Sequence, residues 1–145
     1  MANFVFISSE NALERYSDFR IARIDGSKAT TMKAFYEAIA RELAFPDYFG
    51  HNLDSLDELL NDFEWLQEDK IALYIYNADA FLSQEKSDEK KADLLNLLDV
   101  TAEDWKWVDD EVEETSPKQF LVLFDPSERL RTLLDKEGFA YEKPE

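Results

Sequence analysis

The chain has 145 residues, of which 45% are apolar and 14% aromatic, so it can bury a hydrophobic core as one folded domain. Its formal charge of −17, from 33 acidic and 16 basic residues, disfavours direct nucleic-acid binding and indicates that any partner is basic. Because it has no cysteine, no signal-like start and no apolar run of membrane-spanning length, we expect a soluble cytoplasmic protein without a membrane partner.

Hydrophobic periodicity predicts alternating strands and helices. In chain order, the expected elements are a strand at 4–7, a helical turn at 11–16, a strand at 19–25, a helix from Thr30 or Thr31 that ends before Pro46, a helix from Asn52 to about Glu64, a strand at 71–76, a helix at 87–98, a strand at 120–124 and a helix from Pro126 to about Lys136. The acidic stretch 101–114 fits no single pattern.

Three of these segments indicate the fold class. The runs at 71–76 and 120–124 are continuously apolar, which is typical of strands covered on both faces in a parallel sheet. The strand at 19–25 carries two arginines and is expected near a sheet edge. The order of elements predicts a single-domain α/β fold with a mainly parallel sheet of three to four strands packed with helices.

Few residues could support catalysis. The single histidine, His51, and the absence of cysteine exclude the usual zinc sites and a Cys–His nucleophile pair. Three glycines cannot form a phosphate-cradling loop of Walker or dinucleotide type. His51 acting with Asp54 or Glu58 is the remaining option, but a lone histidine beside a turn is more often a surface or capping residue. We therefore expect neither enzymatic activity nor a cofactor.

The acidic residues of the second helix could also share a hard cation, because Asp54, Asp57 and Glu58 stand at positions i, i+3 and i+4. The calcium-loop pattern is absent, however, and a helix supplies no carbonyl ligands to complete a shell of about six oxygens. We therefore expect no metal site here.

The second helix is amphipathic when each residue is stepped by about 100°. One face carries Leu53, Leu56, Leu59, Leu60 and Phe63, and the opposite face carries Asp54, Glu58, Asn61, Asp62 and Trp65, with Asp57 at the flank. A solvated acidic face is the simpler interpretation. Aromatic residues before and after the helix favour a binding face, since interface hot spots combine aromatics with desolvated charge. The predicted partner-binding residues are Tyr48, Phe49, His51, Asn52, Asp54, Asp57, Glu58, Asn61, Asp62, Phe63 and Trp65.

The stretch from Leu43 to Leu60, LAFPDYFGHNLDSLDELL, resembles the barstar family of intracellular ribonuclease inhibitors. The family pattern is Pro, an acidic residue, Tyr, an aromatic, Gly, any residue, Asn, an aliphatic or Trp, Asp and a leucine-rich helix. This sequence supplies Pro46, Asp47, Tyr48, Phe49, Gly50, Asn52, Leu53 and Asp54. The resemblance implies one domain over residues 1–145, with a barstar-like core at about 19–125. The N-terminal strand, an acidic insertion at about 101–114 and a C-terminal helix at about 126–136 are additions to it.

The resemblance also implies how such a protein works. In barstar the second helix and its preceding loop plug the active site of a basic secreted ribonuclease, and a helix carboxylate occupies the phosphate site. The matching position here is Glu58, with Asp54 one turn earlier and Tyr48 in the loop. Asp57 stands where barstar has a tryptophan that touches the enzyme, which suits a more basic or differently shaped partner.

Two functions follow as hypotheses. The first is an inhibitor or immunity protein for a basic ribonuclease or ribonuclease toxin. The second is an acidic protein-interaction or nucleic-acid-mimic module on a barstar-like scaffold, whose surface would be the segment 101–114. For that segment the simpler interpretation is a solvated helix with Trp105 and Trp107 packed on the core.

Overall fold

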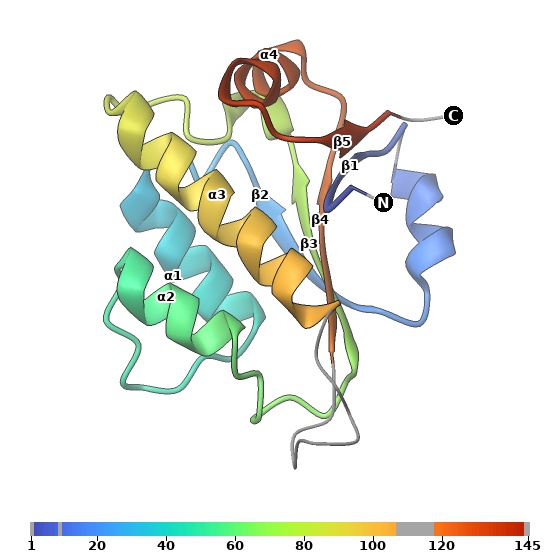
Figure 1. Ribbon diagram of the computed structural model, residues 1–145, viewed down its shortest axis with the longest axis vertical. Helices are drawn as coiled ribbons and strands as arrows, with labels where there is room; N and C mark the ends of the chain where they lie inside the picture. Colours follow the sequence, from blue (N-terminus) through green and yellow to red (C-terminus); the bar gives the residue numbers. More distant parts are fainter. Residues whose placement is uncertain (1, 9, 107–117, 144–145) are drawn as a thin grey trace.

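The computed structural model describes residues 2–8, 10–106 and 118–143 (Figure 1). In chain order the elements are β1 (Phe4–Phe6), η1 (Glu10–Tyr16), β2 (Arg20–Asp25), α1 (Met32–Glu42), α2 (Leu53–Leu60), β3 (Lys70–Tyr76), η2 (Ala78–Ala80), α3 (Asp88–Trp105), β4 (Gln119–Phe124), α4 (Glu128–Glu137) and β5 (Tyr141–Glu142). The η elements are short 3-10 helices. The predicted α/β class is confirmed.

The strands form one parallel sheet in the order β2-β3-β4-β1-β5. β2 lies at an edge, as its two arginines predict, and β3 and β4 are central. The sheet has five strands among the described residues, one more than the upper limit that we predicted. The additional strand, β5, pairs with β1. Because β5 has only two residues, its sequence is too short to show the alternation that predicts a strand.

The two faces of the sheet are covered unequally (Figure 1). Alternate residues of β3 point to opposite faces: Ile71, Leu73 and Ile75 join the large core beneath the α-helices, whereas Ala72 and Tyr74 join a small cluster beneath η1. The large core also contains residues of α1, α2, α3 and α4. One face therefore carries the four α-helices, and the other carries η1.

Side chains at the helix starts explain where the helices begin. Thr31, Ser87 and Ser127 precede α1, α3 and α4, and each accepts a hydrogen bond from the backbone N–H three residues later. Gly138 ends α4 with φ of 79°, a left-handed conformation that favours glycine.

The helix predicted at 87–98 is longer than expected and runs to Trp105. Thr101, Ala102 and Trp105 are buried and extend the apolar spacing that begins at Leu94 and Leu98. The first part of the predicted acidic insertion is therefore the last turn of α3, and Trp105 packs on the core. Residues 107–114 of that insertion, with Trp107, lie outside the described residues.

Within the described part of the chain, no helix combines the length and apolar character needed to cross a membrane.

Candidate partner-binding site

The loop before α2 is built from short-range hydrogen bonds. The N–H of Phe49 donates to Pro46 O at 3.1 Å, and the N–H of Gly50 donates to Ser55 Oγ at 2.9 Å. Asn52 is the N-cap: its Oδ1 accepts from the N–H of Ser55 at 2.8 Å, and its Nδ2 donates to Gly50 O at 3.2 Å. These bonds fix how the chain enters α2.

The aromatic residues of this loop are placed differently from one another. Tyr48 is 68% exposed and is available to a partner. Phe49 is buried, with its ring centroid 4.9 Å from that of Phe45 and 4.7 Å from that of His51. Phe49, predicted to bind a partner, is therefore not exposed beside the acidic face, because its ring anchors the loop to the core through contacts that also include Tyr36. His51 is exposed and adopts φ of 53°.

The face of α2 that points to solvent is acidic. Leu56, Leu59 and Leu60 are buried, whereas the side chains of Asp54, Asp57 and Glu58 are exposed. Among the described residues, none of these three carboxylates forms an ion pair. Asp57 is oriented by Asn61, whose Nδ2 lies 3.0 Å from its Oδ1. The predicted separation of leucines and acids is thus present.

The end of α2 differs from the prediction. The helix stops at Leu60 rather than near Glu64, with Asn61 as its C-cap. Phe63 then adopts φ of 54° and donates its N–H to Leu59 O at 3.1 Å, a left-handed cap of the helix.

The residues beyond that cap do not continue the acidic face as a helix would. Phe63 has no exposed surface and contacts the rings of Trp65, Trp105 and Phe120. The prediction that Phe63 contacts a partner is therefore wrong, since its ring is part of the core. Asp62 and Trp65 are half-buried outside the helix, so Asn61 is the one predicted partner-binding residue after Leu60 that is exposed.

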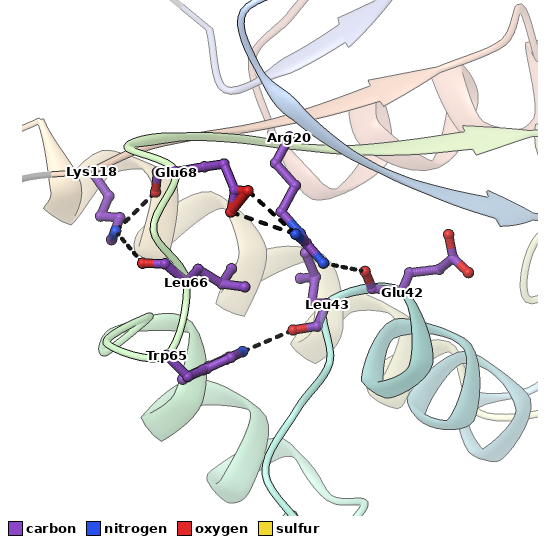
Figure 2. Close-up of polar contacts among 7 residues, drawn as sticks. All are labelled: Arg20, Glu42, Leu43, Trp65, Leu66, Glu68 and Lys118. Carbon is purple, nitrogen blue, oxygen red and sulfur yellow. Dashed lines mark hydrogen bonds and ion pairs between the residues drawn. The ribbon is translucent and has the colours of Figure 1, made fainter.

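Distant residues hold the connection between α2 and β3 in place (Figure 2). Lys118, with a side chain only 6% exposed, donates to the carbonyls of Leu66 at 3.1 Å and Glu68 at 2.8 Å. Arg20 reaches the Glu68 carboxylate at 3.4 Å and the carbonyl of Glu42 at 3.4 Å. Arg20 of β2 and Lys118, the residue before β4, thus fix the segment that follows the acidic helix.

Two indole N–H groups complete this support. Trp65 Nε1 donates to Leu43 O, just after α1, at 2.8 Å, as Figure 2 shows. Trp105 Nε1 donates to Leu60 O, the last residue of α2, at 2.9 Å. The burial of Trp105 on the core agrees with the simpler interpretation of 101–114. The two hydrogen bonds were not predicted, because no sequence pattern identifies the carbonyl that an indole N–H contacts.

The chemistry available on this face is electrostatic binding. The described residues contain no group of three or more His, Cys, Asp or Glu side chains that could hold a metal ion. Exposed carboxylates on α2, beside an exposed tyrosine, present negative charge and aromatic surface to a basic partner.

Comparisons with known proteins identify the family. A search of curated proteins found no match. The structure of the Aeropyrum pernix ORC2 protein (ADPNP-ADP complexes) is similar with a TM-score of 0.57 at 14% identity. The match covers 99% of this chain but 41% of that one, and it reflects the fold alone. The sequence model of the family described as Barstar (barnase inhibitor) matches residues 19–125. The chain therefore belongs to the Barstar family.

Proposed function

We propose that this protein inhibits a basic ribonuclease or ribonuclease toxin by inserting the acidic face of α2 into its active site. The carboxylates of Asp54, Asp57 and Glu58 are exposed and form no ion pair within residues 2–8, 10–106 and 118–143, and this observation carries the proposal. Membership of a family of barnase inhibitors supports it. In a cell that makes such a nuclease, the protein would serve as a cytoplasmic immunity protein.

The physical basis is substrate mimicry by charge. A ribonuclease binds the RNA backbone through basic side chains, and a carboxylate can occupy the place of a phosphate. The chain has no lysine or arginine between Arg41 and Lys70, so no local cation competes with the partner for these carboxylates. The net charge of −17 would also accelerate the encounter with a basic protein through long-range attraction.

The remaining predicted residues have supporting roles in this proposal. Tyr48 is the exposed aromatic anchor at the edge of the acidic face. His51 and Asn52 are exposed residues of the loop before α2 and would lie at the edge of the interface. Asn61 continues the exposed surface beyond the last turn of α2. Asp62 and Trp65, which are half-buried, would contact a partner only at the rim.

The direct test measures inhibition and binding of barnase, together with capture of basic ribonucleases from a cell extract on immobilised protein. Asp54→Ala and Glu58→Ala are each expected to weaken binding by more than about 2 kcal/mol, as truncations of interface hot spots do. Both side chains are exposed, so folding should be retained. A matched control, Asp93→Ala with Glu137→Ala, removes two exposed acids from α3 and α4 and should bind like the wild type.

The proposal fails if Asp54→Ala and Glu58→Ala retain full binding to every ribonuclease that the wild type holds. Loss of binding on charge reversal within 101–114, with α2 variants unaffected, would instead support an acidic interaction module. Capture of the same partners by the wild type and by the Asp54→Ala, Glu58→Ala double variant would also exclude the α2 face.

A further inference from the structure

The sheet has a topological switch point far from the acidic helix. β1 and β4 are adjacent and parallel, but the chain leaves them toward opposite faces of the sheet (Figure 1). η1, which follows β1, packs through Leu13 on the small cluster, whereas α4, which follows β4, packs through Leu130 and Leu134 on the large core. In open α/β sheets, ligands bind in the crevice outside the carboxyl ends of the strands at such a point.

A cavity of about 520 Å³ lies at this position, and we call it the strand-end crevice. Its lining includes Ser8 and Glu10 after β1, Arg23 of β2, Tyr74 and Tyr76 of β3, and Asp125 after β4. Tyr74 and the residues around it belong to the small cluster beneath η1, so the crevice is on the sheet face opposite α2. It is therefore a separate site from the proposed ribonuclease-binding face.

The sheet register places a tyrosine between two carboxylates. Asp25 of β2 pairs with Tyr76 of β3. On the other side, Phe124 of β4 pairs with Ile75, and the next residue, Asp125, receives a hydrogen bond from the N–H of Asn77 at 3.3 Å. Tyr76 is half-buried, and its ring lies 6.0 Å from that of Tyr74.

Three carboxylates, those of Glu10, Asp25 and Asp125, lie near two cations, Arg23 and Lys28. Arg23 pairs with Glu10, and its guanidinium lies 5.9 Å from the centre of the Tyr74 ring. Hydrogen bonds from Ser27 and Asn77 hold the pKa of Asp25 below its usual value, and Lys28 is close enough to lower this pKa further, so Asp25 is charged at neutral pH.

The hydrogen bond from Tyr74 to Asp125 leaves the negative charge of the Asp125 carboxylate in place. The Tyr74 hydroxyl donates to Asp125 Oδ1 at 2.5 Å, and burial raises the pKa of Tyr74, so this hydroxyl stays a neutral donor. Within the described residues, no cation lies over the Tyr76 ring, although Arg23 occupies the equivalent position on Tyr74.

We propose that the strand-end crevice binds a small organic cation of the alkylguanidinium or alkyldiamine class. One charged end contacts Asp125 or Glu10 in the crevice, the stem lies on Tyr76, and the other end reaches Asp25, which lies beyond the crevice on the far side of Tyr76. A single metal ion is a poor occupant, because Asp25 and Asp125 flank β3 on strands about 10 Å apart. A cation over a tyrosine ring is favoured by the quadrupole of the ring, and the acidic protein attracts cations to its surface.

The experiment titrates the ¹⁵N-labelled full chain with agmatine, which carries a guanidinium and an ammonium group. Amide shift changes are expected at residues 23–25, 74–77 and 125. Tyr76→Leu should weaken agmatine binding roughly two- to fivefold through loss of the cation–π contact. Asp125→Asn should weaken it as well. Because Asp125 also bonds Tyr74 and Asn77, Asp25→Asn serves as a second charge variant whose carboxylate lies at the other side of Tyr76.

The controls separate a built site from the general acidic field. Glu58→Gln, on the opposite face of the sheet, should bind agmatine like the wild type, and 1,4-butanediol should produce no shifts. The proposal is overturned if agmatine shifts spread equally over α2, or if Tyr76→Leu and both charge variants bind agmatine like the wild type.

A Gly-Arg-Gly peptide distinguishes the sources of such a cation. If the peptide binds as tightly as agmatine, the ligand is an arginine side chain of a protein. Binding by agmatine alone supports a free small molecule.

Discussion

The two ends of α2 are held by different kinds of contact. At its start, the polar contacts join residues at most five positions apart: Asn52 to Ser55, Asn52 to Gly50, and Gly50 to Ser55. At its end, local bonds from Phe63 N–H to Leu59 O and from Asn61 to Asp57 are joined by contacts between residues 22 to 52 positions apart. Examples are Trp65 to Leu43 and Lys118 to Leu66 (Figure 2). The start is a local structure, whereas the end depends on the assembled sheet.

This difference explains how the acidic face is oriented on the core. Local turns define the first residues of α2 but cannot orient the whole helix on the core. The connection after α2 is fixed to β2 through Arg20, to Lys118 just before β4 and to the end of α1 through Leu43 O, so a rotation of the helix would break contacts to all three. We therefore expect substitutions at the distant contacts to destabilise the protein more than substitutions at the local ones.

The largest effect is expected for Phe63→Ala, in the connection after α2. Phe63 is fully buried against Trp65, Trp105 and Phe120, so its truncation should lower the free energy of unfolding by about 3–5 kcal/mol. Urea denaturation measures the change through the transition midpoint at constant slope. Phe63→Leu keeps most of the volume and should lose less than about 1.5 kcal/mol. A loss below about 1 kcal/mol for Phe63→Ala would contradict the burial argument.

A smaller effect is expected for Lys118→Met, which keeps the aliphatic stem and removes the ammonium group. The carbonyls of Leu66 and Glu68 would lose their donor, which should destabilise the fold by about 1–3 kcal/mol. Lys70→Met is the matched control, because Lys70 forms an exposed pair with Asp18 and should lose at most about 1 kcal/mol.

Hydrogen exchange provides the second measurement for Lys118→Met. Amides of residues 61–69 should exchange faster in this variant than in the wild type, whereas those of the loop before α2 should change less. Equal effects of Lys118→Met and Lys70→Met on stability would show that the buried ammonium does not hold the connection.

The same difference explains what the sequence could predict about α2. Its start at Asn52 and the exposure of its acids follow from a capping residue and from helical periodicity, which are local signals, and both predictions are confirmed. The predicted end near Glu64 is wrong, since α2 ends at Leu60. Residues 61–64 contain no helix breaker, so the local sequence gives no signal for that earlier end. The helix stops where Phe63 leaves it to pack against Trp105 and Phe120, residues that lie more than 40 positions away.

Other differences from the prediction have the same origin. Phe49 stands in a polar turn but is buried because α1 places Tyr36 beside it. β5 has two residues and becomes a strand by pairing with β1, a segment at the other end of the chain. Neither environment can be derived from neighbouring residues. The long apolar strands β3 and β4 were predictable, since burial on both faces selects apolar residues at every position.

The smallest effect is expected for Asn52→Ala, at the local end of α2. The side chain caps Ser55 N–H at 2.8 Å and also donates to Gly50 O, so its loss should lower stability by about 1 kcal/mol, within the range for N-cap residues. Asn52→Asp keeps the cap acceptor and adds negative charge at the helix N-terminus, so it should recover most of the loss. Urea denaturation measures both variants, and hydrogen exchange should show faster exchange at the first turn of α2 in Asn52→Ala alone. If Asn52→Ala destabilises the protein as much as Phe63→Ala, the start of α2 is coupled to the core, and the contrast between its two ends does not hold.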